Sequence, residues 1–193
     1  SPPLRLLEPE AIDGNVTAAE LVILNSLAAR LKPLRIFEFG TFDGRTTLNL
    51  AAHSPEGAKV YTLDLPPKKE VDTRFPLTGD KKFVPQVSRR LRFEKTELEK
   101  KIITLSGDSA DFDISPFLKK MDFIFIDGAH TYEYVLNDSE KALTMLKDQG
   151  VILWHDYGAW EGVTRALNEF YQTRPEYKNL KRVRGTSLAF LIR

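Results

Sequence analysis

Short apolar, β-prone runs alternate with helical patterns along most of the chain, and this alternation restricts the fold more than any other feature. The runs are too continuous for strands with one solvated face, as expected when helices cover both faces of a parallel sheet. They are Arg35–Phe39, Lys59–Leu63, Ile102–Leu105, Met121–Ile126 and Val151–Trp154. We therefore predict an α/β protein with one doubly wound, mostly parallel sheet.

The segments around these runs predict four helices and a final hairpin. The helical patterns cover Thr17–Leu31, Thr46–Ala52, Tyr132–Leu146 (closed by Gly150) and Gly162–Tyr171. At the end of the chain, Leu180–Val183 and Ser187–Ile192 flank a short turn with Gly185 at its centre. The expected architecture is a seven-stranded sheet that finishes in a C-terminal antiparallel hairpin.

The length of 193 residues suits one domain with a sizeable core, so we expect residues 1–193 to form a single domain. The segment 66–98 fits this scheme least, because it holds four prolines and little periodicity. We expect either a lid or insertion over a functional site or a packed surface excursion. Eleven Lys and Arg against six Asp and Glu between Pro66 and Lys101 fit a solvated connection or an anion-binding surface.

Several classes of protein are disfavoured by what the sequence lacks. No apolar run approaches the roughly 20 residues that span a bilayer, and no signal-peptide pattern opens the chain. The absence of cysteine excludes disulfides and thiolate chemistry, and the net charge of +1 gives no sign of nucleic-acid binding. We expect a cytoplasmic protein without a membrane partner. The sequence leaves a homo-oligomer open, since it shows no heptad pattern or long edge strand. A start at Ser1 without Met is compatible with a processed chain or a piece of a longer protein.

A glycine-punctuated turn follows the first apolar run, at the sheet edge where open parallel sheets bind ligands. The run ends in Glu38-Phe39, the turn reads Gly40-Thr41-Phe42-Asp43-Gly44, and polar residues then open a helix. Glycines let the backbone approach a ligand closely, and a helix start presents unpaired N–H groups. We therefore expect a small polar ligand at this turn.

Further motifs follow at the ends of the later strands. They are Val60–Asp64, Ser106-Gly107-Asp108-Ser109, and Asp122–His130 with the subsequent Gly150–Tyr157. Together with the glycine turn, their order resembles the class I S-adenosylmethionine-dependent methyltransferases. The last pair is most similar to the small-molecule O-methyltransferase branch, related to cephalosporin-hydroxylase-like and macrolide-sugar methyltransferases. The resemblance implies a Rossmann-like fold, S-adenosylmethionine as cofactor and the hydroxyl of a small molecule as methyl acceptor.

The resemblance also implies which residues bind the cofactor: Glu38, Gly40, Thr41, Asp43, Gly44, Asp64, Asp108 and Ser109. Asp64 can accept both ribose hydroxyls, and Asp108 with Ser109 can hydrogen-bond an adenine edge. Glu38 would steady the turn or reach the ammonium group of the cofactor. Each acid also has a plainer role, because strand-end acids accept backbone N–H groups and Gly-Asp-Ser is an ordinary turn.

The charge of the turn argues against a nicotinamide or P-loop enzyme. The glycine spacing differs from G-x-G-x-x-G, and no lysine follows the glycines. Asp43 would repel a pyrophosphate, whereas S-adenosylmethionine carries a cationic sulfonium and no phosphate. This comparison of signs favours the methyl donor.

The reacting groups are expected at the ends of the fourth and fifth strands. In the resembling branch, acidic groups there hold a divalent cation, which maps onto Asp127, His155 and Asp156. His155 departs from the all-oxygen version, so Mg, Mn and Zn stay open, as does a site without metal. Asp127 and His130 are the predicted catalytic residues, with the imidazole of His130 as general base. Its structural alternative is to cap the following helix or to bond Asp127.

Four aromatic residues lie near these strand ends: Tyr132, Tyr134, Tyr157 and Trp160. Tyr132 and Tyr157 directly follow the predicted ligands and are candidates for the wall of an acceptor pocket. Two other functions stay open at this point. Methylation of nitrogen or of nucleic acid is disfavoured, because the Asn/Asp-Pro-Pro-aromatic motif is absent after the fourth strand. A catalytically silent module that binds S-adenosylmethionine is the other alternative, against which the histidines and acids argue modestly.

Overall fold

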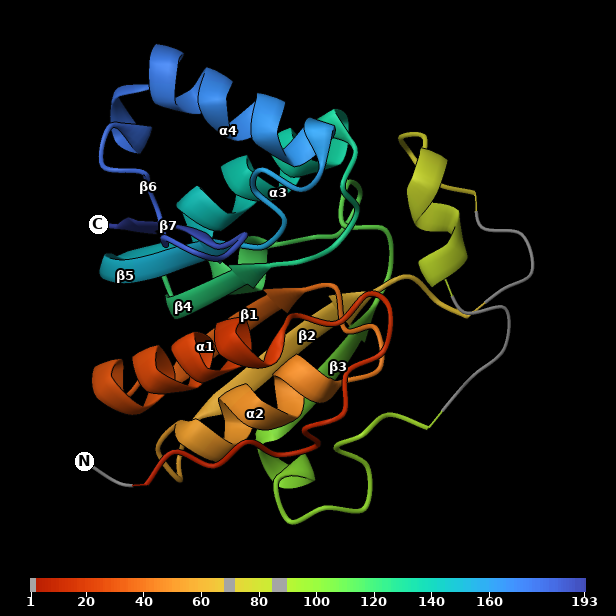
Figure 1. Ribbon diagram of the computed structural model, residues 1–193, viewed down its shortest axis with the longest axis vertical. Helices are drawn as coiled ribbons and strands as arrows, with labels where there is room; N and C mark the ends of the chain where they lie inside the picture. Colours follow the sequence, from red (N-terminus) through yellow and green to blue (C-terminus); the bar gives the residue numbers. More distant parts are fainter. Residues whose placement is uncertain (1–2, 68–71, 85–89) are drawn as a thin grey trace.

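The computed structural model describes residues 3–67, 72–84 and 90–193. Within these residues seven strands form one sheet: β1 (Arg35–Phe39), β2 (Lys59–Asp64), β3 (Ile102–Ser106), β4 (Met121–Ile126), β5 (Leu146–Trp154), β6 (Lys181–Arg182) and β7 (Ala189–Ile192). Their order across the sheet is β3-β2-β1-β4-β5-β7-β6 (Figure 1). The first five strands are parallel, and β7 is antiparallel to β5 and β6. The predicted mostly parallel, seven-stranded sheet with a C-terminal antiparallel hairpin is confirmed.

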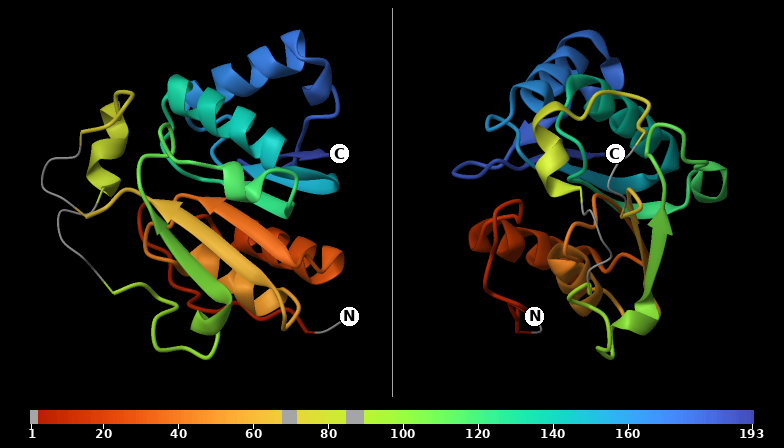
Figure 2. Two further views of the ribbon diagram at one scale, coloured as in Figure 1. Left: turned by 180° about the vertical axis from the view of Figure 1, so that it is seen from behind. Right: turned by 90° about the vertical axis from the view of Figure 1, so that its right-hand side faces the viewer.

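Four α-helices of the described residues cover the two faces of the sheet: α1 (Ala18–Leu31), α2 (Arg45–His53), α3 (Tyr132–Met145) and α4 (Glu161–Thr173). The helices α1 and α2 lie on one face, and α3 and α4 lie on the other (Figures 1 and 2). Because strand side chains alternate, Phe123 and Phe125 of β4 pack in the cluster of α1, while Ile124 and Ile126 pack in that of α3 and α4. None of the helices in the described part of the chain is long and apolar enough to cross a membrane.

The junction between α3 and β5 differs from the sequence prediction. The helix was expected to run through Leu146 and to close at Gly150, whereas β5 begins at Leu146 and contains Gly150. Met121 pairs with Leu146, and the register then shifts before Phe123 pairs with Val151. A Cβ at Gly150 would lie 2.5 Å from the Leu146 side chain, so glycine serves this strand irregularity and not a helix cap.

The expected lid at 66–98 is described only in part, since residues 68–71 and 85–89 lie outside the described residues. In the described part, the 3₁₀ helix η1 (Thr78–Phe83) lies beyond the carboxyl ends of the parallel strands (Figures 1 and 2). Three further single-turn helices are η2 (Glu99–Lys101), η3 (Ser115–Phe117) and η4 (Pro175–Tyr177).

Candidate active site

A cavity of about 660 Å³ lies at the carboxyl ends of the parallel strands. The strand order reverses between β1 and β4, and open α/β sheets bind ligands at such a point. The volume falls within the range of about 300–1,000 Å³ that is typical of small-molecule sites. Loops after the strands line the cavity, together with residues of the N-terminal segment and of η1.

The glycine turn after β1 is fixed by close packing and by one carboxylate. Gly40 has a φ of +93°, and a Cβ there would lie 2.0 Å from the carbonyl oxygen of Asp127. The Oδ2 atom of Asp64 accepts hydrogen bonds from the backbone N–H groups of Thr41 at 3.1 Å and Phe42 at 2.7 Å. Asp64 also lines the cavity, so the same carboxylate shapes the turn and faces a ligand.

Gly40→Ala is expected to destabilise the fold by roughly 2–4 kcal/mol, because the added methyl group meets the backbone of Asp127 and Gly128, just after β4, at an unfavourable φ. Gly57→Ala is the matched control, since a Cβ at Gly57 would meet nothing within 4 Å. Urea titrations of both variants measure the effect. Equal midpoints for the two variants would contradict the packing argument.

Glu38 lies beneath the turn and does not line the cavity. Its side chain is fully buried, and its Oε2 atom accepts hydrogen bonds from the hydroxyls of Thr47 and Thr62. Burial raises the pKa of Glu38 to about 8. Of the two roles predicted for Glu38, this geometry favours support of the turn over contact with a ligand.

The raised pKa predicts a dependence of stability on pH that Glu38→Gln removes. The folded state keeps a proton on Glu38 up to a pKa of about 8, whereas the ordinary value is 4.5. The wild type therefore loses stability as the pH rises through this window, by up to about 1.4 kcal/mol per pH unit. The stability of Glu38→Gln relative to wild type should thus increase from pH 4.5 to pH 8, measured as the free energy of unfolding. Parallel profiles would show that Glu38 is charged in the folded protein.

The eight residues predicted to bind the cofactor divide into two groups. Gly40, Asp64, Asp108 and Ser109 line the cavity, whereas Glu38, Thr41, Asp43 and Gly44 are not among its lining residues. The carboxylate of Asp43 accepts a hydrogen bond from the backbone N–H of Arg45 and pairs with Arg92 at 2.8 Å. Asp43 therefore stabilises the start of α2 and holds residue 92 to the turn.

Asp108 connects three parts of the chain. Its Oδ2 atom accepts hydrogen bonds from the Tyr134 hydroxyl and from the backbone N–H of Arg74, both at 2.8 Å. Its Oδ1 atom accepts a bond of 2.9 Å from the backbone N–H of Ala110. Burial and the bond to Asp108 raise the pKa of Tyr134, so its hydroxyl stays a donor.

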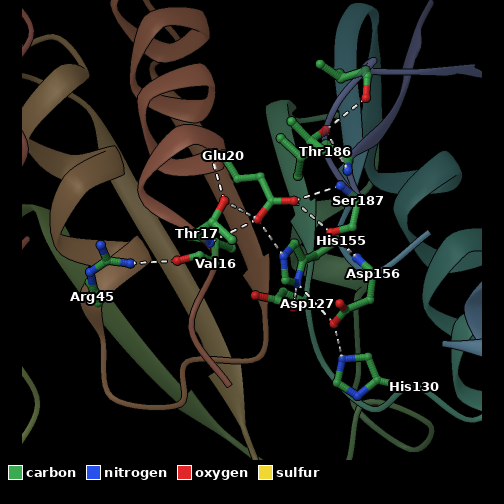
Figure 3. Close-up of polar contacts among 12 residues, drawn as sticks. Val16, Thr17, Glu20, Arg45, Asp127, His130, His155, Asp156, Thr186 and Ser187 are labelled. Carbon is green, nitrogen blue, oxygen red and sulfur yellow. Dashed lines mark hydrogen bonds and ion pairs between the residues drawn. The ribbon is translucent and has the colours of Figure 1, made fainter. Parts of the chain in front are cut away.

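His155, at the end of β5, lies among carboxylates (Figure 3). Its Nδ1 atom is 3.0 Å from Asp127 Oδ1 and 3.1 Å from Asp156 Oδ2, and its Nε2 atom is 3.2 Å from Glu20 Oε2. Burial opposes a charge on the ring, but the carboxylates outweigh it and raise the pKa of His155 to about 12. Both ring nitrogens therefore act as donors to acids.

His130 lies on the opposite side of Asp156. Its Nε2 atom is 2.8 Å from Asp156 Oδ2, and its Nδ1 atom is 2.5 Å from Asp80 Oδ1. The ring of Trp160 stacks on the imidazole with a centroid distance of 4.4 Å and an interplanar angle of 17°. Burial lowers the pKa of His130, but Asp156 and Asp80 raise it to about 9.

One grouping among the described residues could hold a metal ion. Ligand atoms of Asp127, His130 and Asp156 all lie within 4.8 Å of one another. Two carboxylates suit Mg²⁺ and Mn²⁺, and an imidazole suits Zn²⁺ and Mn²⁺. In this grouping His130 takes the place that the sequence prediction gave to His155, whose Nε2 atom faces Glu20.

Glu20 and Asp80 belong to the site although the sequence analysis did not single them out. Glu20 forms a capping box with Thr17 at the start of α1, and its Oε1 atom accepts hydrogen bonds from the N–H and the hydroxyl of Ser187. The Thr-x-x-Glu pattern predicts the helix cap, but it does not predict the contact of Glu20 with His155. Asp80 lies in an aperiodic segment without a local signal.

Aromatic rings form part of the cavity wall. Of the two residues predicted to form this wall, Tyr157 lines the cavity, whereas the hydroxyl of Tyr132 donates a hydrogen bond to Glu169 away from it. Tyr134 and Trp160 also line the cavity. Phe83 of η1 adds a ring that the sequence analysis had not considered.

The lining of the cavity is strongly acidic. Among the described residues, one lysine and one arginine line the cavity, Lys82 and Arg182. The Nζ atom of Lys82 pairs with Asp13 at 2.8 Å. Eight acids line the same cavity: Asp13, Glu20, Asp64, Asp80, Asp108, Asp127, Asp138 and Asp156. Such a lining favours a cationic ligand.

Comparison with known proteins finds one family and many structures of the same fold. The sequence model of a family described as a methyltransferase domain matches residues 37–157. Catechol O-methyltransferase domain-containing protein 1 of Mus musculus is 28% identical over 196 residues, which cover 94% of this chain and 62% of that protein. The chain thus spans less than two thirds of the length of this curated relative.

Among solved structures, the O-methyltransferase TomG from Streptomyces achromogenes, in complex with SAM, is similar with a TM-score of 0.65 and 18% identity. The alignment covers 93% of this chain and 82% of TomG. An O-methyltransferase from Bacillus cereus, in complex with SAH, has a TM-score of 0.65 and 17% identity, and covers 97% of this chain and 84% of that one. Both share the fold described above.

Proposed function

The chain belongs to the methyltransferase domain family, and we propose that it moves a methyl group from S-adenosylmethionine to a hydroxyl oxygen of a small molecule. The observation that carries this proposal is the acidic cavity at the switch point of the sheet, where eight acids outnumber four basic side chains, Lys82, Arg182, His130 and His155. A sulfonium cation suits this lining, whereas the phosphates of a dinucleotide do not. TomG and the Bacillus cereus enzyme, with SAM and SAH in the same fold, support this choice of cofactor.

The residues of the cavity fit the polar groups of the cofactor. Each carboxylate oxygen has two lone pairs, so Asp64 can accept ribose hydroxyls in addition to the N–H groups of the turn. Ser109 and Asp108 lie at the end of β3, where they would face the adenine. The described part of segment 66–98 lines the cavity through Leu77 and Phe83 among others, which supports a covering role.

In the proposed reaction the acceptor hydroxyl lies beside Asp127 and His130. The Nε2 atom of His130 takes the hydroxyl proton, the oxygen attacks the methyl carbon, and the electron pair of the carbon–sulfur bond goes to sulfur, which releases S-adenosylhomocysteine. Holding both partners in line is the main task of the site, and such positioning supplies about 7–11 kcal/mol of the barrier.

A divalent cation fits the same site. Asp127 and Asp156 would hold it, with the Nδ1 atom of His155 as a nitrogen ligand so that His130 stays free to act as the base, and it would acidify the acceptor hydroxyl. Asp156, Asp80 and Asp127 keep His130 protonated at neutral pH, since they raise its pKa to about 9. A cation held by Asp127 and Asp156 would offset two of these negative charges and favour the unprotonated imidazole that a base requires.

The proposal is tested by methyl transfer itself. The chain is incubated with S-adenosylmethionine and a panel of catechols, other hydroxylated small molecules and their amine analogues, and products are identified by mass spectrometry. We expect O-methylated product and its loss on treatment with EDTA, with recovery on adding Mg²⁺, Mn²⁺ or Zn²⁺. Transfer to amines alone would overturn the choice of oxygen, and activity insensitive to EDTA would overturn the metal. Cofactor binding without product would favour a catalytically silent module.

A further inference from the structure

We infer that Asp80 is a positioning residue for His130, brought to the active site by η1, and that it sets the orientation and tautomer of the imidazole. This inference rests on the proposed function, because it concerns how the proposed base is held. It assigns a role to a residue that lies 50 positions away in the sequence.

The contact between the two residues is a two-point clamp. Asp80 Oδ2 accepts the backbone N–H of His130 at 2.8 Å, and Asp80 Oδ1 accepts from the Nδ1 atom of the ring at 2.5 Å. The main chain at Asp80 is held in turn, because its backbone N–H donates to the carbonyl oxygen of Leu77 at 2.8 Å. A proton on Nδ1 that faces Asp80 leaves Nε2 to face Asp156, which lies 2.8 Å away.

Other side chains of η1 enclose the same imidazole. Phe83 meets the His130 ring edge-on, with centroids 6.3 Å apart, while Trp160 stacks on the ring. Gly79 packs on Trp160 so closely that a Cβ would lie 3.2 Å from the indole. The ring therefore has little freedom to turn while η1 is in this place.

The burial of Asp80 argues against a purely structural contact. The Asp80 residue is only 4% exposed, and it is the one buried member of Thr78–Phe83. Its neighbours Lys81 and Lys82 are exposed. A buried carboxylate costs free energy unless it is paired, and an apolar side chain would dock a short turn without that cost. An acid that faces inward is instead what orients an imidazole, as in carboxylate–histidine pairs of enzymes.

The inference is tested with Asp80→Asn and Asp80→Ala against Asp148→Asn, the same chemical change at an exposed position of β5. Nitrogen-15 NMR of labelled histidine, recorded at pH 10 so that His130 with its pKa of about 9 is neutral, reports the tautomer directly, and the chain has only three histidines to assign. We expect His130 to lose its fixed Nδ1–H tautomer in both Asp80 variants and to keep it in Asp148→Asn. The kcat should fall by about 10- to 100-fold in both, while the KM for S-adenosylmethionine changes little. Asp80→Glu should recover part of the rate.

An unchanged His130 tautomer in both Asp80 variants would overturn the inference, as would an unchanged kcat. A rise in KM without a fall in kcat would also overturn it, because it would mark Asp80 as a cofactor contact. The NMR measurement needs no acceptor, so it stays decisive even where wild-type protein transfers no methyl group. Absence of methyl transfer by the wild-type protein would instead refute the proposed function.

Discussion

His130→Ala is expected to lower the rate of methyl transfer by about 100- to 10,000-fold, the usual contribution of a general base. The imidazole is the titratable group that three neighbours hold in place: Asp80 at Nδ1, Asp156 at Nε2 and Trp160 against the ring face. Its removal leaves the acceptor proton without a positioned base, yet it leaves the residues around Asp64 untouched. The affinity for S-adenosylhomocysteine should therefore change by no more than a few-fold.

The matched control is His53→Ala. That histidine ends α2, and its ring bonds the backbone of Asn49 and Arg5 outside the cavity. Turnover of His53→Ala should equal that of the wild type. Full activity of His130→Ala would return His130 to the role of a structural residue at the start of α3.

Asp64→Ala is expected to weaken binding of S-adenosylhomocysteine by about 10- to 100-fold, since hydrogen bonds to a charged group contribute about 1.5–3 kcal/mol. Asp64 lines the cavity, but its carboxylate also holds the N–H groups of Thr41 and Phe42. A loss of affinity could thus arise from a loosened turn, and the control has to separate these two causes. Titration calorimetry gives the affinity, and thermal unfolding gives the stability.

Asp122 provides that control. Its Oδ2 atom accepts backbone N–H groups of Leu34 and Arg35 at 2.9 and 2.8 Å, at the opposite end of the sheet. Asp122→Ala removes a similar pair of backbone bonds without touching the cavity. We expect it to lower stability as Asp64→Ala does, but to bind S-adenosylhomocysteine like the wild type. Equal affinity in both variants would remove Asp64 from the cofactor site.

The fold was predictable because its determinants are local. Alternating apolar runs and helical patterns fix both the element types and the parallel sheet. The predicted helix end at Leu146 was wrong, because Leu146 pairs with Met121 as the first residue of β5. That contact is not visible in a local sequence pattern. Glu38 follows the period of two along β1, which places it with Ile36 on the face of α2 and away from the cavity.

The site was predictable only where strand ends supply it. Asp127, His155 and Asp156 come together because parallel strands end at one edge of a sheet. Glu20 and Asp80 reach the same cluster from α1 and η1, across separations of 135 and 50 residues. Such contacts depend on how loops and helices pack on the sheet, which no periodicity in this sequence encodes.

The central claim is that the acidic cavity binds S-adenosylmethionine, and titration calorimetry with S-adenosylhomocysteine tests it most directly. The purified chain should bind one equivalent with micromolar affinity, in buffers with and without EDTA, because Asp64 and Ser109 line the cavity independently of the metal grouping. NAD and ATP, which carry phosphates, should not bind. Absence of heat with S-adenosylhomocysteine in either buffer, for folded protein, would contradict the proposed cofactor and with it the proposed reaction.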